Sequence, residues 1–370
     1  MSRTEAQDHG LSGFPRVALG HYPTPLEAAP RLGRSLGIDL LIKRDDCTGL
    51  AFGGNKVRQL EFYLGEARQQ GTDTVLITGA VQSNFVRLAA AACRRLGLDI
   101  HIQLEQRVAH DDPAYHASGN VLLDRLLGAH IHAFPDGHDE VAADAALEAL
   151  ARGLAAAGRR PYVVHLGIDH PPLGGLGYVA AGQELAGQLR AQSRGVDAVI
   201  VPSGSGLTHA GLLVGLRASG LAARVMGICV RRPAAQQHDR ILRRAREIAD
   251  LLGRPDLITA ADVVVSDVAL APGYGQLNDA TLSAMAMAAR LEGLVLDPVY
   301  SAKTLAGLVA LAKDGAIASG SRVVFLHTGG QPALFGYESE LTDYLDRRSG
   351  PKPVTATSNP SAADIERPSP

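Results

Sequence analysis

The segment Lys43-Arg-Asp-Asp-Cys-Thr-Gly-Leu-Ala-Phe-Gly-Gly-Asn-Lys56 follows a short apolar run and leads into a long stretch with the apolar spacing of a helix. Its paired glycines, Gly53 and Gly54, let the backbone approach a ligand closely. Lys56 would begin the helix, where the positive potential of the helix end lowers the pKa of a lysine and favours its neutral, nucleophilic amine. Two interpretations fit this segment alone: a lysine that forms a Schiff base, or a solvated lysine in a glycine turn.

The regions around this segment alternate between short runs rich in β-branched residues and longer stretches of helical spacing. Such alternation is typical of a parallel sheet covered by helices on both faces. We expect strands at residues 39–42, 74–78, 100–104, 130–133, 162–165, 198–201, 225–230, 262–265 and 322–326. We expect helices at residues 56–70, 84–96, 138–157, 176–192, 208–218, 235–252, 278–292, 302–313 and 332–346. Because these elements are too many for one compact sheet, we predict two α/β domains.

The composition excludes several classes of function. The 370 residues carry 36 basic and 38 acidic side chains without a long basic block, so neither nucleic acid nor a membrane is expected as a partner. The three cysteines have neither disulfide nor zinc-site spacing, and we expect no metal and a reducing, cytoplasmic location. No membrane helix or signal peptide is expected. The proline-rich end, residues 348–370, is expected to be a disordered tail.

Ligands of open α/β sheets bind at the carboxyl ends of strands, and two further loops lie at such positions. Gly79-Ala-Val-Gln-Ser-Asn-Phe85 would place Ser83 and Asn84 at a helix N-terminus, which binds carboxylates well; a plain capping turn is the alternative. Val201-Pro-Ser-Gly-Ser-Gly-Leu-Thr-His-Ala-Gly211 offers free N–H groups and hydroxyls to a phosphate-sized ligand. Because this loop matches neither G-x-G-x-x-G nor a Walker loop, a single phosphate is favoured over a dinucleotide.

Two late segments complete the set of candidate ligand-binding residues. Asp297-Pro-Val-Tyr-Ser-Ala-Lys303 and His327-Thr-Gly-Gly330 each lie near the end of an expected strand. Tyr300 and Tyr274 are candidates for acid–base or substrate contacts, although semi-buried packing is the alternative for either. A reactive lysine, a carboxylate loop, a single-phosphate loop and hydroxyl-rich strand ends together describe the needs of one cofactor.

The run KRDDCTGLAFGGNKVRQLEF resembles the lysine segment of the D-cysteine desulfhydrases and 1-aminocyclopropane-1-carboxylate (ACC) deaminases. Later runs resemble the same family in the same order, from about residue 21 to 337: GAVQSN, PLGGLGY, GSGLTHAG, EGLVLDPVYSAK and HTGGQPALFGY. This family is tryptophan synthase β-like. The resemblance implies pyridoxal 5′-phosphate (PLP) as cofactor, a small amino acid as substrate, a homodimer, and PLP fold type II. It implies two three-layer α/β domains with mostly parallel twisted sheets: a large domain of residues 1–56 and 166–347, and a small domain of residues 57–165.

The resemblance also implies a role for each matching residue. Lys56 would carry the cofactor and act catalytically together with Ser83, Tyr274 and Tyr300. The further cofactor contacts would be Asn55, Asn84, Gly204, Ser205, Gly206, Leu207, Thr208, Ser301 and Thr328. The substrate contacts would be Ser83, Asn84, Phe85, Tyr274 and Tyr300.

Two positions distinguish the activities within the family. ACC deaminases have Glu where Ser301 stands and Leu where Thr328 stands; a carboxylate favours a protonated pyridine ring, whereas a hydroxyl leaves the ring a weaker electron sink. We therefore predict α,β-elimination of a small β-substituted amino acid to pyruvate, ammonia and the leaving group, as in D-cysteine desulfhydrases. ACC deamination and a specialised biosynthetic lyase or synthase are alternatives, because Phe85, Leu207 and residues 165–172 depart from the desulfhydrase pattern. More distant alternatives are a nicotinamide-dependent oxidoreductase and a non-catalytic PLP-binding protein.

Overall fold

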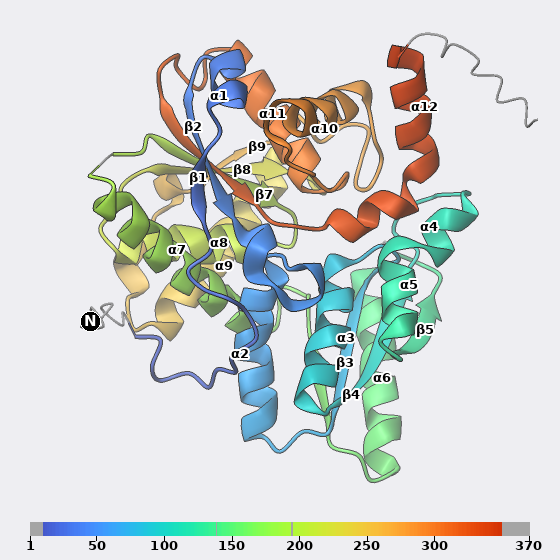
Figure 1. Cartoon of the computed structure of the whole chain (residues 1–370). Helices are drawn as coiled ribbons and strands as arrows, with labels where there is room; N and C mark the ends of the chain where they lie inside the picture. Colours follow the sequence, from blue (N-terminus) through green and yellow to red (C-terminus); the bar gives the residue numbers. More distant parts are fainter. Residues whose placement is uncertain (1–9, 138, 194, 350–370) are drawn as a thin grey trace, which may run out of the picture.

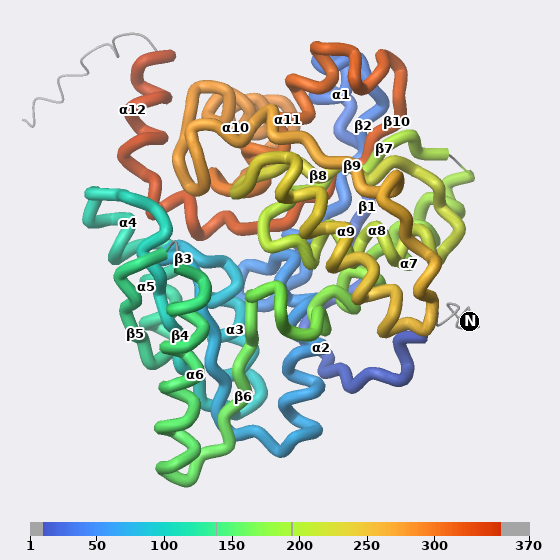
Figure 2. The backbone as a smooth tube through the Cα atoms, turned by 180° about the vertical axis from the view of Figure 1, so that it is seen from behind, coloured from blue at the N-terminus to red at the C-terminus, as the bar shows by residue number. Residues whose placement is uncertain are grey.

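Two sheets form the framework of the molecule (Figure 1). The structure is a computed structural model that describes residues 10–137, 139–193 and 195–349. A six-stranded sheet has the order β1-β2-β10-β7-β8-β9, and a four-stranded sheet has the order β5-β4-β3-β6. All neighbouring strands are parallel except the pair β1 and β2. Figures 1 and 2 show each sheet within its own lobe, with the two lobes side by side.

The large lobe is a three-layer structure. Along β10, Val323 and Phe325 belong to one core, and Val324 and Leu326 belong to the core on the opposite face. Because successive side chains of a strand point to opposite faces, a strand that is apolar throughout must be covered by helices on both sides. Its strands are β1 (Leu26–Ala28), β2 (Asp39–Arg44), β7 (Ala198–Ser203), β8 (Arg224–Cys229), β9 (Val264–Ser266) and β10 (Arg322–His327). Helices α7 (Leu173–Ala191), α8 (Leu207–Ala218) and α9 (Ala234–Leu251) contribute to one core; α1 (Pro30–Leu36), α10 (Asp279–Glu292) and α11 (Ser301–Lys313) contribute to the other.

The small lobe repeats this plan. Along its central strand, Val75 and Ile77 pack in the core that includes α3, whereas Leu76 packs against Leu147 of α6. Its strands are β3 (Thr74–Ala80), β4 (Asp99–Glu105), β5 (His130–Phe134) and β6 (Pro161–Val164). Its helices are α3 (Asn84–Leu96), α4 (Pro113–Ala117), α5 (Gly119–Leu126) and α6 (Glu140–Ala156). The fold is therefore α/β with two mostly parallel, three-layer units.

Helix α2 (Lys56–Gln69) packs against elements of both lobes, namely α7 and α3. The contact with α7 depends on small residues, because a Cβ atom at Gly177 would lie 2.1 Å from the carbonyl oxygen of Arg58. The division of the chain at residues 57 and 165 stays a prediction. Because α2 contacts both lobes, Lys56 at its start lies at the boundary between them.

The strands at all nine expected places are present, and most expected helices begin and end within a few residues of their predicted bounds. The sequence analysis missed β1, α1, α4 and α5, all of which are short. The single helix expected at residues 332–346 is wrong. The chain forms a 3₁₀ segment, η5 (Gln331–Gly336), and then α12 (Glu338–Ser349), because Tyr337 is buried and its hydroxyl donates to the carbonyl of Gly275 (2.9 Å).

Two further expectations concern regions that are only partly described. The helix expected at residues 138–157 corresponds to α6, but residue 138 lies outside the described residues. The tail expected at residues 348–370 is wrong at its start, because Arg348 belongs to α12 and its guanidinium lies 5.2 Å from the ring centroid of Tyr344. Residues 350–370 lie outside the described residues. Across the described ranges, no helix is both long and apolar enough to cross a membrane.

Candidate active site

One cavity lies between the two lobes and collects most of the residues that the sequence singled out. Its empty volume, counted up to the open mouth, is about 810 Å³. The expected residues that line it are Asn55, Lys56, Ser83, Asn84, Phe85, Gly204, Ser205, Gly206, Thr208, Tyr274, Tyr300 and Thr328. Ser301 and Leu207 do not line it.

Lys56 is the first residue of α2 and projects into this cavity. Its Nζ lies 3.3 Å from Oε1 of Gln59 and 4.9 Å from the ring centroid of Phe85. Burial lowers the pKa of Lys56 to about 8, because a charged ammonium is poorly solvated there. A substantial fraction of the amine is therefore neutral near pH 8 and able to attack a carbonyl carbon.

The backbone that leads into Lys56 requires glycine at two positions. Gly53 and Gly54 have φ angles of 66° and 128°, which L side chains rarely adopt. A Cβ atom on Gly53 would lie 2.1 Å from the carbonyl oxygen of Asp46. Thr48 holds the turn, since its hydroxyl accepts from the N–H of Gly54 (2.7 Å) and donates to the carbonyl of the same residue (3.0 Å).

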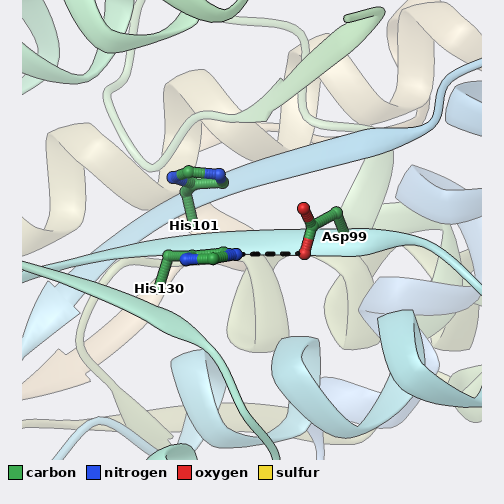
Figure 3. A group of neighbouring side chains, drawn as sticks. All are labelled: Asp99, His101 and His130. Carbon is green, nitrogen blue, oxygen red and sulfur yellow. Dashed lines mark ion pairs between the residues drawn. The ribbon is translucent and has the colours of Figure 1, made fainter.

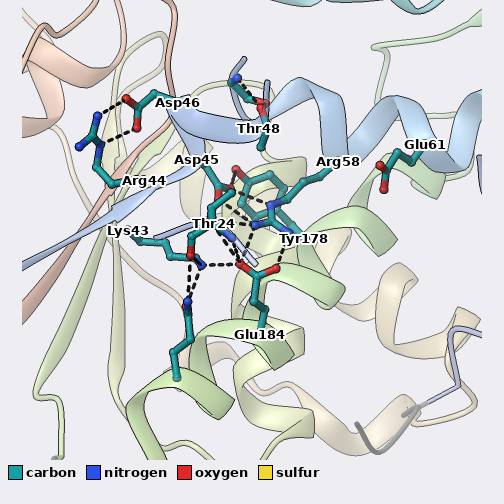
Figure 4. Close-up of polar contacts among 12 residues, drawn as sticks. Thr24, Lys43, Arg44, Asp45, Asp46, Thr48, Arg58, Glu61, Tyr178 and Glu184 are labelled. Atoms are coloured by element: carbon teal, nitrogen blue, oxygen red, sulfur yellow. Dashed lines mark hydrogen bonds and ion pairs between the residues drawn. The ribbon is translucent and has the colours of Figure 1, made fainter. Parts of the chain in front are cut away.

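A buried ionic network fixes the helix behind Lys56 (Figure 4). Arg58 donates to both carboxylate oxygens of Asp45 (2.9 Å each) and to Glu184 of α7 (2.9 and 3.1 Å). Tyr178 donates to Asp45 (2.7 Å), and Lys43 forms an ion pair with Glu184. Burial alone would raise the pKa of Asp45, but the attraction of Arg58 lowers it. The network therefore joins the end of β2, α2 and α7 at the start of the lysine helix.

The loop after β7 has the features of a phosphate site. Gly206 caps α8 with a φ angle of 108°, and the N–H groups of the first turn of a helix have no acceptor within that helix. The hydroxyl oxygen of Thr208 accepts from Nδ2 of Asn55 (2.8 Å) and from Nε2 of Gln59 (2.9 Å). Since both amides donate to this oxygen, the hydroxyl hydrogen of Thr208 is free to donate to a ligand. This end of the cavity fits a dianionic phosphate group.

The N-terminus of α3 forms another wall of the cavity. Ser83 caps the helix by accepting from the N–H of Val86 (3.3 Å). The side-chain oxygen of Asn84 accepts from Nδ2 of Asn120 (2.9 Å), which leaves the Nδ2 donor of Asn84 available to an acceptor in the cavity. This donor and the first-turn N–H groups of α3 suit an anionic oxygen, such as a carboxylate or a phenolate.

Tyr274 and Tyr300 form a pair, with 2.6 Å between their hydroxyl oxygens. Burial, followed by the proximity of Tyr274, raises the pKa of Tyr300, so Tyr300 keeps its proton at neutral pH. Lys303 supports the pair from α11 by donating to the carbonyls of Leu270 (3.0 Å) and Gly273 (2.5 Å). These contacts attach the loop that carries Tyr274 to the helix that follows Tyr300.

Asp297 lines the cavity, but its carboxylate is already saturated. It accepts four hydrogen bonds: from the N–H groups of Val299 (3.1 Å), Tyr300 (2.9 Å) and Ser301 (2.7 Å), and from the hydroxyl of Ser301 (2.6 Å). A carboxylate has about four acceptor positions, so none remains for a ligand. The hydroxyl of Ser301 is thus directed at Asp297, and Thr328 is the other hydroxyl that could face the ring nitrogen of the cofactor. In the described part of the chain, the Thr328 hydroxyl has no hydrogen-bond partner.

The sequence analysis missed Gln59, Arg107, Arg231 and Asp297. Gln59 lies one helical turn after Lys56, a spacing that places two side chains on the same helix face. Arg107 and Arg231 follow β4 and β8, so the rule that ligands bind at the carboxyl ends of strands could have identified both. Asp297 stood in a quoted segment, but its hydrogen bonds could not be foreseen.

A separate group of side chains lies on the small sheet, away from this cavity (Figure 3). Asp99, His101 and His130 bring three potential ligand atoms within 4.8 Å of one another, with 3.4 Å between Asp99 Oδ1 and His130 Nε2. The two imidazole rings are stacked, with centroids 4.5 Å apart. Because the lone pair of an imidazole nitrogen lies in the ring plane, stacked rings do not converge on one ion, and this arrangement does not support a metal site.

Comparisons with known proteins agree with the fold and with the chemistry of the cavity. The model of the family described as "Pyridoxal-phosphate dependent enzyme" matches residues 17–329. A 1-aminocyclopropane-1-carboxylate deaminase of Burkholderia multivorans is 40% identical over 90% of this chain and 99% of its own. A D-cysteine desulfhydrase of Salmonella choleraesuis is 42% identical over 90% of this chain and 99% of its own. The crystal structure of an ACC deaminase homologue matches with a TM-score of 0.81 at 34% identity, over 93% of this chain and 100% of that chain.

Proposed function

Because this chain belongs to the pyridoxal-phosphate dependent enzyme family, as a lyase-type member, we propose that it eliminates the β-substituent of a small amino acid, as a D-cysteine desulfhydrase does. The observation that carries this proposal is the contrast between the hydrogen-bonding states of Thr328 and Asp297. The Thr328 hydroxyl lines the cavity without a hydrogen-bond partner among the described residues, whereas the Asp297 carboxylate, which also lines it, has its acceptor positions occupied. This polar environment does not favour a protonated ring, which suits elimination. Family membership leaves the nicotinamide-dependent alternative without support.

The residues of the cavity fit the cofactor at three points. We propose that Lys56 carries it covalently, and that Asn84 donates to its phenolic oxygen. The phosphate would be held by the backbone N–H groups from Gly204 to Thr208 together with the Thr208 hydroxyl. Leu207 would contribute through its backbone alone, because its side chain packs in the core. Asn55 and Gln59 act on the phosphate end by orienting Thr208.

When bound, the cofactor withdraws electrons from the substrate and makes the proton on its Cα atom acidic. In the proposed reaction, Lys56 Nζ takes this proton as its neutral amine. The Cα–Cβ double bond forms as the Cβ–substituent bond breaks, and the substituent leaves with the electron pair. Water converts the released 2-aminoacrylate to pyruvate and ammonia. Ser83 and the first-turn N–H groups of α3 bind the substrate carboxylate, and the pair formed by Tyr274 and Tyr300 flanks the substrate.

ACC deamination is the second candidate function, because relatives with that name match 88–90% of this chain at similar identity. The products separate the two reactions. We expect pyruvate from β-substituted alanines such as D- or L-cysteine, L-cysteate and β-chloroalanine, and no 2-oxobutyrate from ACC. Keto acids would be identified chromatographically after incubation of the purified holoenzyme with each compound. Formation of 2-oxobutyrate from ACC as the main activity would replace the proposal with its alternative.

We also propose that the chain is a homodimer that works in a reducing, cytoplasmic environment. The proposed location is supported by Cys47, Cys93 and Cys229, which are all unpaired.

The proposed dimer is supported by exposed apolar side chains. Leu122 and Leu126 of α5 and Phe335 of η5 are 54%, 78% and 60% exposed, and α5 packs against η5. Neighbouring exposed apolar side chains favour an interface between protein subunits. We expect sedimentation equilibrium to give twice the mass of 38.7 kDa, and Leu126→Glu to shift the protein towards monomer; a wild-type monomer at micromolar concentration would contradict the dimer.

A further inference from the structure

Two arginines line the active-site cavity beside the tyrosine pair. The side chains of Arg107 and Arg231 are 11% and 19% exposed, and the guanidinium of Arg231 lies 5.9 Å from the ring centroid of Tyr274. Arg107 comes from the small lobe, after β4, and Arg231 from the large lobe, after β8. They therefore approach the substrate region from both sides of the cavity.

Both guanidinium groups are held in place, and both retain free donors. Arg107 makes two hydrogen bonds to Glu105 (2.6 and 2.8 Å) through Nε and Nη2, and its Nη1 group has no acceptor in the described part of the chain. Arg231 contacts Glu140 through Nη2 (2.7 Å), and within the described residues its other N–H groups have no protein acceptor. None of these donor groups is among the buried side-chain atoms that lack a hydrogen-bond partner. Preorganised arginines with unused donors are well suited to bind an anion.

The same two arginines also line a second, smaller cavity of about 350 Å³ that adjoins the first. Its walls are strongly charged: Glu105, Glu140, Asp144, Arg107, Arg231 and Arg240. With Arg232, which also contacts Glu140 (2.7 Å), four guanidinium groups face three carboxylates. Burial, followed by the repulsion of Arg232, lowers the pKa of Arg240 to about 10, which is consistent with an excess of positive charge around this cavity.

We propose that Arg107 and Arg231 form a second anion-binding subsite, so that the substrate is an α-amino acid whose β-substituent is itself negatively charged, such as a sulfonate or a phosphate ester. This inference rests on the proposed elimination. The α-carboxylate occupies the N-terminus of α3, and the β-substituent extends past the tyrosines towards the second cavity. Positive charge at this place stabilises the departing anion, for example sulfite from cysteate, as the Cβ–S bond breaks and the sulfur keeps the electron pair.

Arg232 and Arg240 have a different role from the proposed pair. Arg232 donates to the carbonyl of Gly204 (3.3 Å) and Arg240 to the carbonyl of Ser205 (2.8 Å), so both support the phosphate loop through its backbone. The competing explanation is that Arg107 and Arg231 also serve the cofactor phosphate. A test must therefore measure cofactor affinity as well as substrate selectivity.

The test compares kcat/KM of the holoenzyme for anionic substrates (L- and D-cysteate, O-phosphoserine) with that for neutral ones (cysteine, β-chloroalanine). We expect the wild-type enzyme to favour an anionic substrate, and Arg231→Ala to lower the ratio of anionic to neutral kcat/KM on the order of 10- to 100-fold, as expected for a lost charge-assisted hydrogen bond. Arg231→Ala should fold, because Glu140 keeps Arg232 as its partner. Arg107→Lys retains a charge for buried Glu105 but loses the guanidinium fork, and should lower the ratio as well.

The matched control is Arg243→Ala, which removes an exposed arginine of α9 that lies outside both cavities and should leave the ratio unchanged. Unchanged selectivity in both cavity variants would overturn the subsite while leaving the elimination intact. A weaker PLP affinity without altered selectivity would assign the arginines to the cofactor and also overturn it. If no compound yields pyruvate, the proposed reaction fails, and the subsite is then judged by whether L-cysteate raises the Tm of the wild-type protein more than that of Arg231→Ala.

Discussion

Replacing Lys56 with alanine is expected to abolish both the visible absorbance of the lysine-linked cofactor and the formation of pyruvate. The Lys56 side chain contacts Gln59 (3.3 Å) and the ring of Phe85 and takes no part in the Arg58 network, so its removal leaves the contacts that support α2 intact. The absorbance spectrum and the turnover number of the purified variant, reconstituted with PLP, check this expectation. Lys313→Ala is the matched control, because Lys313 is an exposed lysine at the end of α11. Retained turnover in Lys56→Ala would refute the proposed role.

The pH dependence of cofactor attachment tests the same lysine without a mutation. Because burial lowers the pKa of Lys56 to about 8, the amine of the cofactor-free protein is mostly protonated below this pH and mostly neutral above it. The attachment rate should therefore rise about tenfold per pH unit from pH 6 towards pH 8 and then level off. Stopped-flow absorbance after addition of PLP measures this rate. A rise that continues to pH 10 would indicate a lysine with an ordinary pKa.

Removing Arg58 is expected to destabilise the folded protein strongly. Arg58→Ala would leave the buried carboxylate of Asp45 without its ion-pair partner and Glu184 with Lys43 alone. Breaking a buried ion pair in this way typically costs about 3–5 kcal/mol, because the remaining charge on Asp45 is poorly hydrated and has lost its cationic partner. Chemical denaturation of the cofactor-free protein, followed by circular dichroism, measures the change in the free energy of unfolding.

The matched substitution for this experiment is again Arg243→Ala, whose ion pairs with Glu247 and Asp169 are exposed. Exposed pairs contribute about 0–1 kcal/mol, so the two arginines should differ clearly. Because the network of Arg58 holds the start of α2, Arg58→Ala should also weaken PLP binding at concentrations of denaturant too low to unfold the protein. A loss of stability no larger than that of Arg243→Ala would show that the buried network is not needed for folding.

Much of the fold and of the site could be predicted from local patterns. Alternating apolar runs identified the strands, because a strand buried on both faces carries consecutive apolar residues, as residues 323–326 of β10 do. The glycine turn before Lys56 and the small-residue loop before Thr208 were recognisable because positive φ angles and free helix N-termini impose their own residue types. The strands, the glycine turn and the small-residue loop depend on residues close together in the sequence, so the sequence alone is enough to predict them.

Other features depended on residues far apart in the chain. The direction of the Ser301 hydroxyl was not predictable, because it is determined by the four hydrogen bonds that saturate Asp297. The break of the last helix at Tyr337 follows from its bond to Gly275, 62 residues earlier, which overrides the helical spacing. Arg107 and Arg231 carried no motif, since an arginine after a strand is common.

The sequence by itself determined the order of the elements, the family resemblance, and the two segments that carry Lys56 and the proposed phosphate loop. Only the tertiary structure decided which side chains meet between the lobes: Gln59 with Thr208, Arg58 with Glu184, and the two arginines with the tyrosine pair. The physical reason is the separation along the chain over which each interaction acts. Backbone conformation and periodicity are set within a few residues, whereas hydrogen bonds and charges act between groups that folding brings within a few ångströms, whatever their separation along the chain.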